Sequence, residues 1–326
     1  MKDITISRRS LLVSAGLLAL APLAGCGGNS DSGSAAADSD YTIGVLQLTE
    51  HSALDAANDG FVKAIKKSGL KVKIDQKNAQ NDQSTCKSIA DKFVGDGIDL
   101  IYAIATPAAQ AAAGATADIP IVGCAITDYA ASGLVQDNDK PGTNVTGASD
   151  LTPVAEQLEM MQKVLPDVKK VGLLYCTAES NSDVQIKAAK KELGKLGLEY
   201  TDFTVSSSNE IQSVVESAVG KVDALYSPTD NTIAAGASQV GQICKENKLP
   251  YVTGEEGMCM AGGLFTLSIN YEDLGYAAGE MAVKILKGEA KAEDMPIKHL
   301  SSKDLVVVKN DEMAEALGID LSALDE

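Results

Sequence analysis

The sequence predicts an α/β fold with two similar doubly wound parallel-sheet lobes, joined by a hinge, with a ligand cleft between them. Short apolar runs typical of buried strands alternate with segments whose apolar residues recur at helical spacing. The same order of strand-like runs occurs twice along the chain. The 286 residues from position 41 onward also fit two domains of ordinary size better than one small core.

The first half of this body contains four strand-like runs, at residues 41–46, 72–74, 97–102 and 119–122. Between the first two, Leu54, Phe61 and Ile65 recur at helical spacing, and Gly69 is suited to end that helix. Apolar residues in the segment 89–94 mark a second helix. Strand and helix therefore alternate from the start of the body.

The second half repeats this order. The runs at 171–175, 221–226 and 249–252 match those at 41–46, 97–102 and 119–122. A helix expected over 271–287 would return to the first lobe, and a strand over 305–308 would return to the second. We therefore assign residues 41–149 plus 271–290 to lobe 1, and residues 150–270 plus 291–326 to lobe 2.

Residues 1–25 have the layout of an export signal. Lys2, Arg8 and Arg9 precede an apolar run at 11–23 that is too short to span a bilayer as a mature helix. The sequence Leu-Ala-Gly-Cys at 23–26 resembles the lipobox of bacterial lipoproteins, which implies cleavage before Cys26 and lipid attachment to it. We expect an extracytoplasmic protein, anchored to the outer face of the cytoplasmic membrane by lipidated Cys26.

The residues beside the apolar run bear on the export route and on the segment that follows Cys26. Ser-Arg-Arg-Ser-Leu-Leu at 7–12 also resembles a twin-arginine signal, so the general and the twin-arginine routes both stay open. Residues 26–40 are mostly small or acidic, with no apolar period, which predicts a flexible tether.

Composition excludes several classes of function. The formal net charge is −17, and loss of residues 1–25 would move it to −19, so nucleic-acid binding is not expected. Five cysteines follow Cys26, at positions 86, 124, 176, 244 and 259; they form no Cys-x-x-Cys pair, and their odd number argues against a full disulfide framework. We expect no metal and no cofactor.

Polar residues that follow the strand-like runs are the candidates for ligand binding, because ligands of such sheets lie beyond the carboxyl ends of the strands. The candidates are Gln47, Thr49, His51, Ala105, Thr106, Asp128, Ser149, Glu179, Asn181, Ser182, Asp230, Asn231, Glu255 and Asn270. Their hydroxyl, amide and carboxylate groups suit a ligand with both an ammonium and a carboxylate. The absence of tryptophan argues against a sugar, which usually stacks on aromatic faces.

Two charge contacts are expected within this set. Thr106 is the predicted N-cap of a helix with Pro107 at its first position, and the free N–H groups there would hold a carboxylate. Asp128, Glu179 or Asp230 would hold the ammonium.

Five stretches at these strand ends are similar to a known family. They read ATPAAQ at 105–110, PGTNVTGASD at 141–150, ESNS at 179–182, TDN at 229–231 and NYEDLG at 270–275. On these residues the chain resembles the substrate-binding lipoproteins of ABC importers, in particular the group associated with tryptophan and other aromatic amino acids. The resemblance implies a type I periplasmic binding protein that closes around one small ligand. That group often has Asp where this chain has Asn270.

The expected function follows from this resemblance and from the residues available for catalysis. Only His51 and His299 could serve a triad, and no phosphate loop, dinucleotide fingerprint or His-Glu-x-x-His motif is present, so an enzyme is not expected. We expect a monomeric binding protein that delivers an amino acid, with an aromatic one favoured, to an ABC permease and its ATPase. A sensor for another amino acid, a nucleoside or a sugar is the alternative, and an exported hydrolase is a weaker one.

Overall fold

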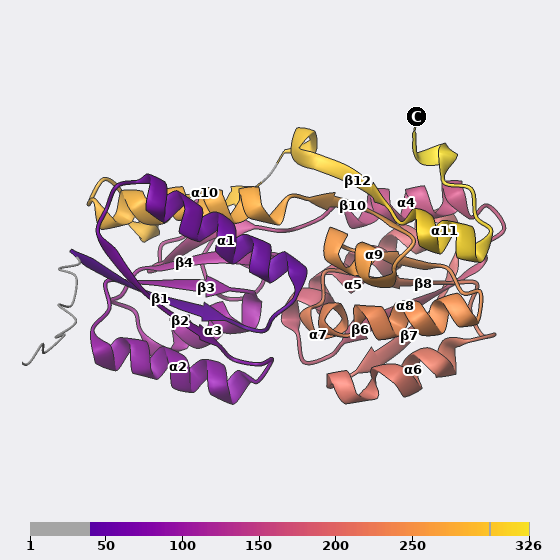
Figure 1. Cartoon of the computed structure of the whole chain (residues 1–326), viewed down its shortest axis with the longest axis horizontal. Helices are drawn as coiled ribbons and strands as arrows, with labels where there is room; N and C mark the ends of the chain where they lie inside the picture. The colour runs from indigo at the N-terminus through magenta and orange to yellow at the C-terminus, as the bar shows by residue number, and fades with distance from the viewer. Residues whose placement is uncertain (1–39, 300, 326) are drawn as a thin grey trace, which may run out of the picture. The chain divides into compact units, whose positions relative to one another are not determined.

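A computed structural model of the chain describes residues 40–299 and 301–325 (Figure 1). The expected export signal, the lipid-attachment residue Cys26 and the tether up to residue 39 lie outside the described residues. The predictions made for them therefore stay predictions.

Lobe 1 is built on a parallel sheet with the strand order β11-β5-β4-β3-β1-β2. Its strands are β1 (Tyr41–Gln47), β2 (Val72–Asn78), β3 (Leu100–Ile104), β4 (Ile121–Ile126), β5 (Val145–Ser149) and β11 (Lys298–His299). Helices α1 (Ser52–Lys67) and α10 (Tyr271–Leu286) lie on one side of the sheet, and α2 (Gln83–Asp96) and α3 (Thr106–Ala115) on the other (Figure 1). Every residue of β3, β4 and β5 is buried, as expected for parallel strands covered on both faces.

Helices α1 and α10 approach each other closely through glycines. A Cβ atom on Gly275 would overlap the backbone carbonyl of Ala57, and one on Gly60 would overlap that of Glu272. Only a hydrogen atom fits at these two positions, so the two backbones can come together. This packing fixes the start of α10, and with it Tyr271, at the edge of lobe 1.

Lobe 2 contains a parallel sheet with the order β7-β6-β8-β9 and an antiparallel pair, β10 with β12. The strands are β6 (Lys170–Cys176), β7 (Glu199–Val205), β8 (Ala224–Ser227), β9 (Tyr251–Thr253), β10 (Phe265–Ile269) and β12 (Leu305–Lys309). The α-helices are α4 (Val154–Val164), α5 (Ser180–Leu196), α6 (Ile211–Ala218), α7 (Asn231–Ala235), α8 (Ala237–Glu246), α9 (Glu256–Gly262) and α11 (Asp311–Leu317). Short 3-10 turns occur at η1 (Ser208–Glu210), η2 (Ala292–Asp294), η3 (Ser302–Asp304) and η4 (Ser322–Leu324).

The two apolar clusters of lobe 2 lie on opposite faces of its sheet. Leu173 and Tyr226 belong to one cluster, and Leu174 and Leu225 belong to the other. Successive strand residues therefore alternate between two helix layers. The predicted fold class, two similar α/β lobes with parallel sheets, is confirmed.

The return from lobe 1 to lobe 2 comes later than the sequence indicated. Residues 291–326 were assigned to lobe 2, but β11 pairs in parallel with β5 of lobe 1. The Thr146 hydroxyl also donates a hydrogen bond to the carbonyl of Met295 (2.7 Å). A two-residue strand carries no hydrophobic period, so the sequence pattern could not show it.

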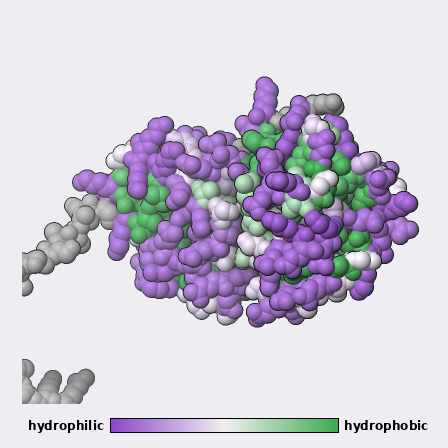
Figure 2. All heavy atoms as spheres, turned by 45° about the vertical axis from the view of Figure 1, so that its right-hand side comes forward, coloured by the Kyte–Doolittle hydropathy of each residue, from purple (hydrophilic) through white to green (hydrophobic). Residues whose placement is uncertain are grey.

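The surface is largely polar on the face shown in Figure 2, with apolar patches between the polar side chains. Within residues 40–299 and 301–325, no helix is both long and apolar enough to cross a membrane. The five cysteines in this part of the chain are all buried, and none is in a disulfide.

Candidate functional site

A small cavity, with about 10 Å³ of space accessible to a water molecule, lies between the lobes. It is lined by His51, Ala53, Leu54, Ala125, Thr127, Asp150, Asn181, Thr229, Asp230, Asn231, Ala234, Glu255 and Tyr271. Most of these residues follow the carboxyl ends of strands, where the sequence predicted the cleft. The structure therefore brings His51, Asn181, Asp230, Asn231 and Glu255 of the predicted set together around one space.

The two lobes are closed over this cavity. His51 Nε2 lies 3.3 Å from Asn231 Oδ1 on the opposite lobe. The Asn81 side-chain amide donates a hydrogen bond to the Thr232 hydroxyl (3.0 Å), again from one lobe to the other. Polar side chains are thus paired across the interface between the lobes.

The cavity carries three buried carboxyl groups and no lysine or arginine among its lining residues. Burial raises the pKa of Asp150 to about 6, against the hydrogen bond from Tyr271, which lowers it. Burial and the nearby Glu179 charge raise the pKa of Asp230 to about 7, and burial raises the pKa of Glu255 to about 7. Burial in the closed cavity therefore favours neutral carboxyl groups, and a ligand with a positive charge would favour the ionised ones.

Glu179 organises the lobe 2 side of the site. Its two carboxylate oxygens accept hydrogen bonds from the backbone N–H and the side chain of both Asn231 (3.1 and 2.7 Å) and Thr232 (2.8 and 2.8 Å). Protein donors thus occupy this carboxylate, which holds the start of α7 beside the start of α5.

Asp230 is likewise held by donors of lobe 2. It accepts hydrogen bonds from the backbone N–H of Cys176 (2.6 Å) and Ile233 (2.9 Å), and from the Ser182 hydroxyl (2.7 Å). Asp230 is the N-cap of α7. Ser182 does not line the cavity; its hydrogen bond holds Asp230 in position.

The start of α3 differs from the sequence expectation. The N-cap is Ala105, at φ +83°, and Thr106 is the first helical residue, so the prediction of Thr106 as the N-cap was wrong by one position. A positive φ is strained for alanine and is typical of functional sites. The Thr106 hydroxyl is buried without a partner, and no side chain caps this helix, so its first N–H groups remain available. Neither Ala105 nor Thr106 is among the residues that line the cavity.

Two predicted residues lie away from the cavity, in local hydrogen bonds. Asp128 accepts hydrogen bonds from the backbone N–H of Ala131 (3.0 Å) and the side chain of Asn138 (3.1 Å), and so holds a turn. Asn270 is exposed and caps α10 by accepting from the backbone N–H of Asp273 (2.9 Å). The structure therefore gives both residues roles in local structure.

Three more predicted residues are buried beside the cavity rather than lining it. The Gln47 side chain donates to the Thr49 carbonyl (2.8 Å) and to Asp55 (2.7 Å). The Ser149 hydroxyl donates to the Thr127 carbonyl (2.7 Å). These contacts shape the loops that follow β1, β4 and β5.

The sequence interpretation missed Asp150 and Tyr271, which both line the cavity. The Tyr271 hydroxyl donates a hydrogen bond to Asp150 Oδ2 (3.0 Å). Each residue stands next to one that was named, Ser149 and Asn270, so the rule that strand ends carry the site could have found them.

His51 is a neutral hydrogen-bonding group in this site. Burial lowers its pKa below the ordinary value, against smaller opposing effects of Asn231 and nearby carboxylates. Its Nδ1 atom is buried without a partner. The histidine therefore offers one ring nitrogen to a ligand.

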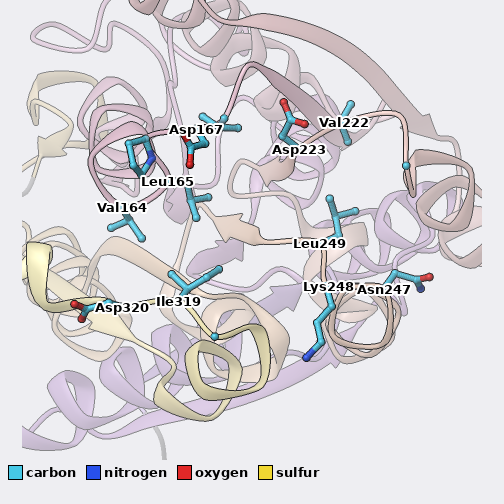
Figure 3. A pocket seen from close by; sticks show the side chains of 14 residues that line it. Val164, Leu165, Asp167, Val222, Asp223, Asn247, Lys248, Leu249, Ile319 and Asp320 are labelled. Carbon is cyan, nitrogen blue, oxygen red and sulfur yellow. The ribbon is translucent and has the colours of Figure 1, made fainter.

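A second, open groove lies in lobe 2, formed by loops at the amino ends of β6, β8 and β9 (Figure 3). Its polar groups are bound within the protein: Asp223 accepts from the backbone N–H groups of Lys169 (2.9 Å) and Lys170 (2.8 Å), and Lys248 donates to the Ala316 carbonyl. Ligands of parallel α/β sheets bind at the opposite strand ends. We therefore take the cavity between the lobes as the functional site.

Comparison with known proteins identifies the family of the chain. Residues 42–323 match the family of ABC transporter substrate-binding proteins. The chain belongs to this family. It is 41% identical to a tyrosine-binding protein of Clostridioides difficile, over 96% of this chain and 93% of that protein.

Two solved structures are similar to the chain to different degrees. A Streptococcus pneumonia ABC domain in complex with L-Trp has a TM-score of 0.85 at 41% identity, covering 88% of this chain and 98% of that one. The ligand-free, open structure of a Clostridium difficile substrate-binding protein with adhesive properties has a TM-score of 0.66 at 46% identity, covering 86% and 95%. The lower structural similarity to the protein described as open, despite the higher identity, agrees with the closed lobes described here.

The unliganded protein should lose stability as the pH rises from about 5 to 8. Because the pKa values of Asp150, Asp230 and Glu255 are raised, the folded closed form binds protons that the unfolded chain has already released in this range. Within this range the loss should be about 1.4 kcal/mol for Asp150 alone, since its pKa of about 6 lies one unit above pH 5 and one pKa unit corresponds to about 1.4 kcal/mol. His51 contributes in the opposite direction, because its lowered pKa means that the unfolded chain binds a proton on this histidine at a pH where the folded form does not.

Chemical denaturation at several pH values measures this dependence. Asp150→Asn should flatten the curve, since it removes one of the titrating groups. A free energy of unfolding that is constant or rises between pH 5 and 8 would contradict the proposed burial of these carboxyl groups.

Proposed function

We propose that this chain is a lipid-anchored, extracytoplasmic solute-binding protein that takes an amino acid, preferably an aromatic one, into the cavity between its lobes and presents it to an ABC permease. The observation that carries this proposal is the closed cavity, lined from both lobes by carboxylates, hydroxyls and amides. A zwitterionic ligand supplies the positive charge that the lining residues lack. The tyrosine-binding relative and the L-Trp complex support an aromatic ligand.

An aromatic side chain suits the rest of the lining. Ala53, Leu54, Ala125 and Ala234 give the cavity an apolar part, and Tyr271 adds an aromatic ring. Alanine side chains are small and would crowd an aromatic side chain least, and aromatic rings pack favourably against one another. Polar atoms thus hold the ligand's charges while apolar atoms surround its side chain.

Ligand binding is proposed to occur without a chemical reaction. Within the cavity lining there is no serine, cysteine or lysine to act as a nucleophile, and His51 is paired with Asn231. The open form would bind ligand on one lobe, and closure would complete the shell from the other. A monomer in this closed form would then dock on the permease, whose ATPase drives uptake.

Aromatic L-amino acids should stabilise the purified protein. Binding to the folded state raises its stability by about 2.7 kcal/mol at a hundredfold excess over the Kd, so the melting temperature should rise with L-Tyr, L-Trp or L-Phe. Thermal melts against amino acids, nucleosides and sugars measure this. A shift only with nucleosides or sugars would contradict the amino acid assignment.

The start of α3 is proposed to hold the ligand carboxylate, together with the unpartnered Thr106 hydroxyl. Thr106→Val keeps the shape but removes the hydroxyl, so it should weaken binding at least tenfold, because a hydrogen bond to a charged group contributes about 1.5–3 kcal/mol. Titration calorimetry gives the affinity.

Thr266→Val is the matched control for this change. The Thr266 hydroxyl is also buried without a partner, but it lies in β10 of lobe 2 and not at the start of α3. This variant should bind as the wild type does. Equal affinities in both variants would place the carboxylate elsewhere.

Lipid attachment at Cys26 is the proposed reason for membrane association. In the native host, Cys26→Ser should move the protein from the membrane fraction to the soluble extracytoplasmic fraction, which immunoblotting of the fractions detects. Unchanged membrane association would refute the lipid anchor and leave the cavity assignment intact.

A further inference from the structure

Asp150 stands at the hinge, where the chain first leaves lobe 1. It follows β5 directly, and Tyr271 begins α10, where the chain returns from lobe 2 to lobe 1. The Tyr271 hydroxyl donates to Asp150 Oδ2 over 3.0 Å, so this hydrogen bond joins two crossovers. Both side chains line the cavity.

The carboxylates around the cavity differ in how well the protein compensates their charge. Asp230 accepts from two backbone N–H groups and one hydroxyl, and Glu255 accepts from the backbone N–H groups of Gly257 (2.5 Å) and Met258 (2.6 Å) at the start of α9. Glu179 accepts from the backbone and side-chain groups of α7 described above. Each of these three carboxylates accepts hydrogen bonds from backbone N–H groups at the start of a helix. Negative charge is favoured at such a position.

Asp150 has weaker partners within the described residues. Its side chain accepts from the Tyr271 hydroxyl and, at 3.5 Å, from the Thr127 hydroxyl. Apart from that of Asp150 itself, no backbone N–H of the described residues donates to its carboxylate. A buried carboxylate with so few donors is costly when ionised, unless a cation joins it.

Asn181 provides an acceptor on the opposite lobe. Its side-chain N–H groups donate to Glu179 (3.0 Å) and to the Thr229 carbonyl (3.3 Å), which fixes the orientation of the amide. Its Oδ1 atom is then left buried without a partner, in a residue that lines the cavity. An uncompensated acceptor on lobe 2 and an uncompensated carboxylate at the hinge therefore border one space.

We propose that Asp150, the oxygen of Tyr271 and Oδ1 of Asn181 form the seat for the α-ammonium group of the ligand. An ammonium has three N–H donors, and Tyr271 can accept one while it donates its own hydrogen to Asp150. This assignment rests on the proposed function and names the group that selects amino acids over ligands without a cation. Because the seat joins both crossovers to lobe 2, ammonium binding there favours closure.

Calorimetry with paired ligands tests the seat. The ligands are L-Tyr and L-Trp, each compared with its analogue that lacks the amino group, 3-(4-hydroxyphenyl)propionate or indole-3-propionate. Asp150→Asn should weaken binding of the amino acid by about 30-fold or more, because it removes one partner of a buried charge pair. Binding of the analogue should be unchanged or tighter, since the analogue has no ammonium group that would lose its carboxylate partner.

Two controls separate a binding role from a structural one. Asp128→Asn makes the same change in a carboxylate that holds a turn outside the cavity, and it should bind all four ligands as the wild type does. Unliganded Asp150→Asn should melt at or above the wild-type temperature at pH 7.5, since it removes an uncompensated buried charge. Loss of affinity with retained or increased stability is the expected combination.

The outcomes distinguish this seat from the proposed function itself. If the wild type binds the amino acid and Asp150→Asn binds it within threefold as well, the seat is overturned while the function stands. Equal loss of both members of a ligand pair would also overturn it, because Asp150 would then act on the fold. A wild type that binds only ligands without an amino group would overturn both proposals.

Discussion

The closed structure depends on how the negative charge buried between the lobes is compensated. Asp150, Asp230 and Glu255 line one cavity with no basic residue among the lining groups, and their raised pKa values express the cost of ionising them there. When the lobes separate, water can solvate these groups. A ligand that brings a positive charge lowers the free-energy cost of closure. The attraction between this charge and the buried carboxylates therefore favours both binding and closure.

The surrounding architecture fixes the groups that meet the ligand. Glycines in α1 and α10 bring these helices together and so position Tyr271. Burial of the whole of β5 positions Asp150 at the strand end. In lobe 2, the hydrogen bonds of Glu179 hold the starts of α5 and α7, so that Asn181 is oriented before the ligand arrives. Recognition therefore uses side chains on rigid elements, with the hinge between them.

The sequence predicted the fold well because strand-like and helical patterns alternate clearly and repeat. It predicted the site in part. Strand-end position identified His51, Asn181, Asp230 and Glu255, but it cannot tell which of two successive residues faces the cavity, so Ser149 and Asn270 were named in place of Asp150 and Tyr271. Asp128 was named because it is acidic and follows a strand, whereas local donors in its own turn hold it away from the cavity.

A crystal structure of the protein with bound L-Tyr or L-Trp tests the account most directly. The account predicts closed lobes around the ligand, with the amino nitrogen about 2.7–2.9 Å from a carboxylate oxygen of Asp150. A ligand whose amino nitrogen contacts Asp230 or Glu255 instead, or a ligand bound in the open groove of lobe 2, would contradict it.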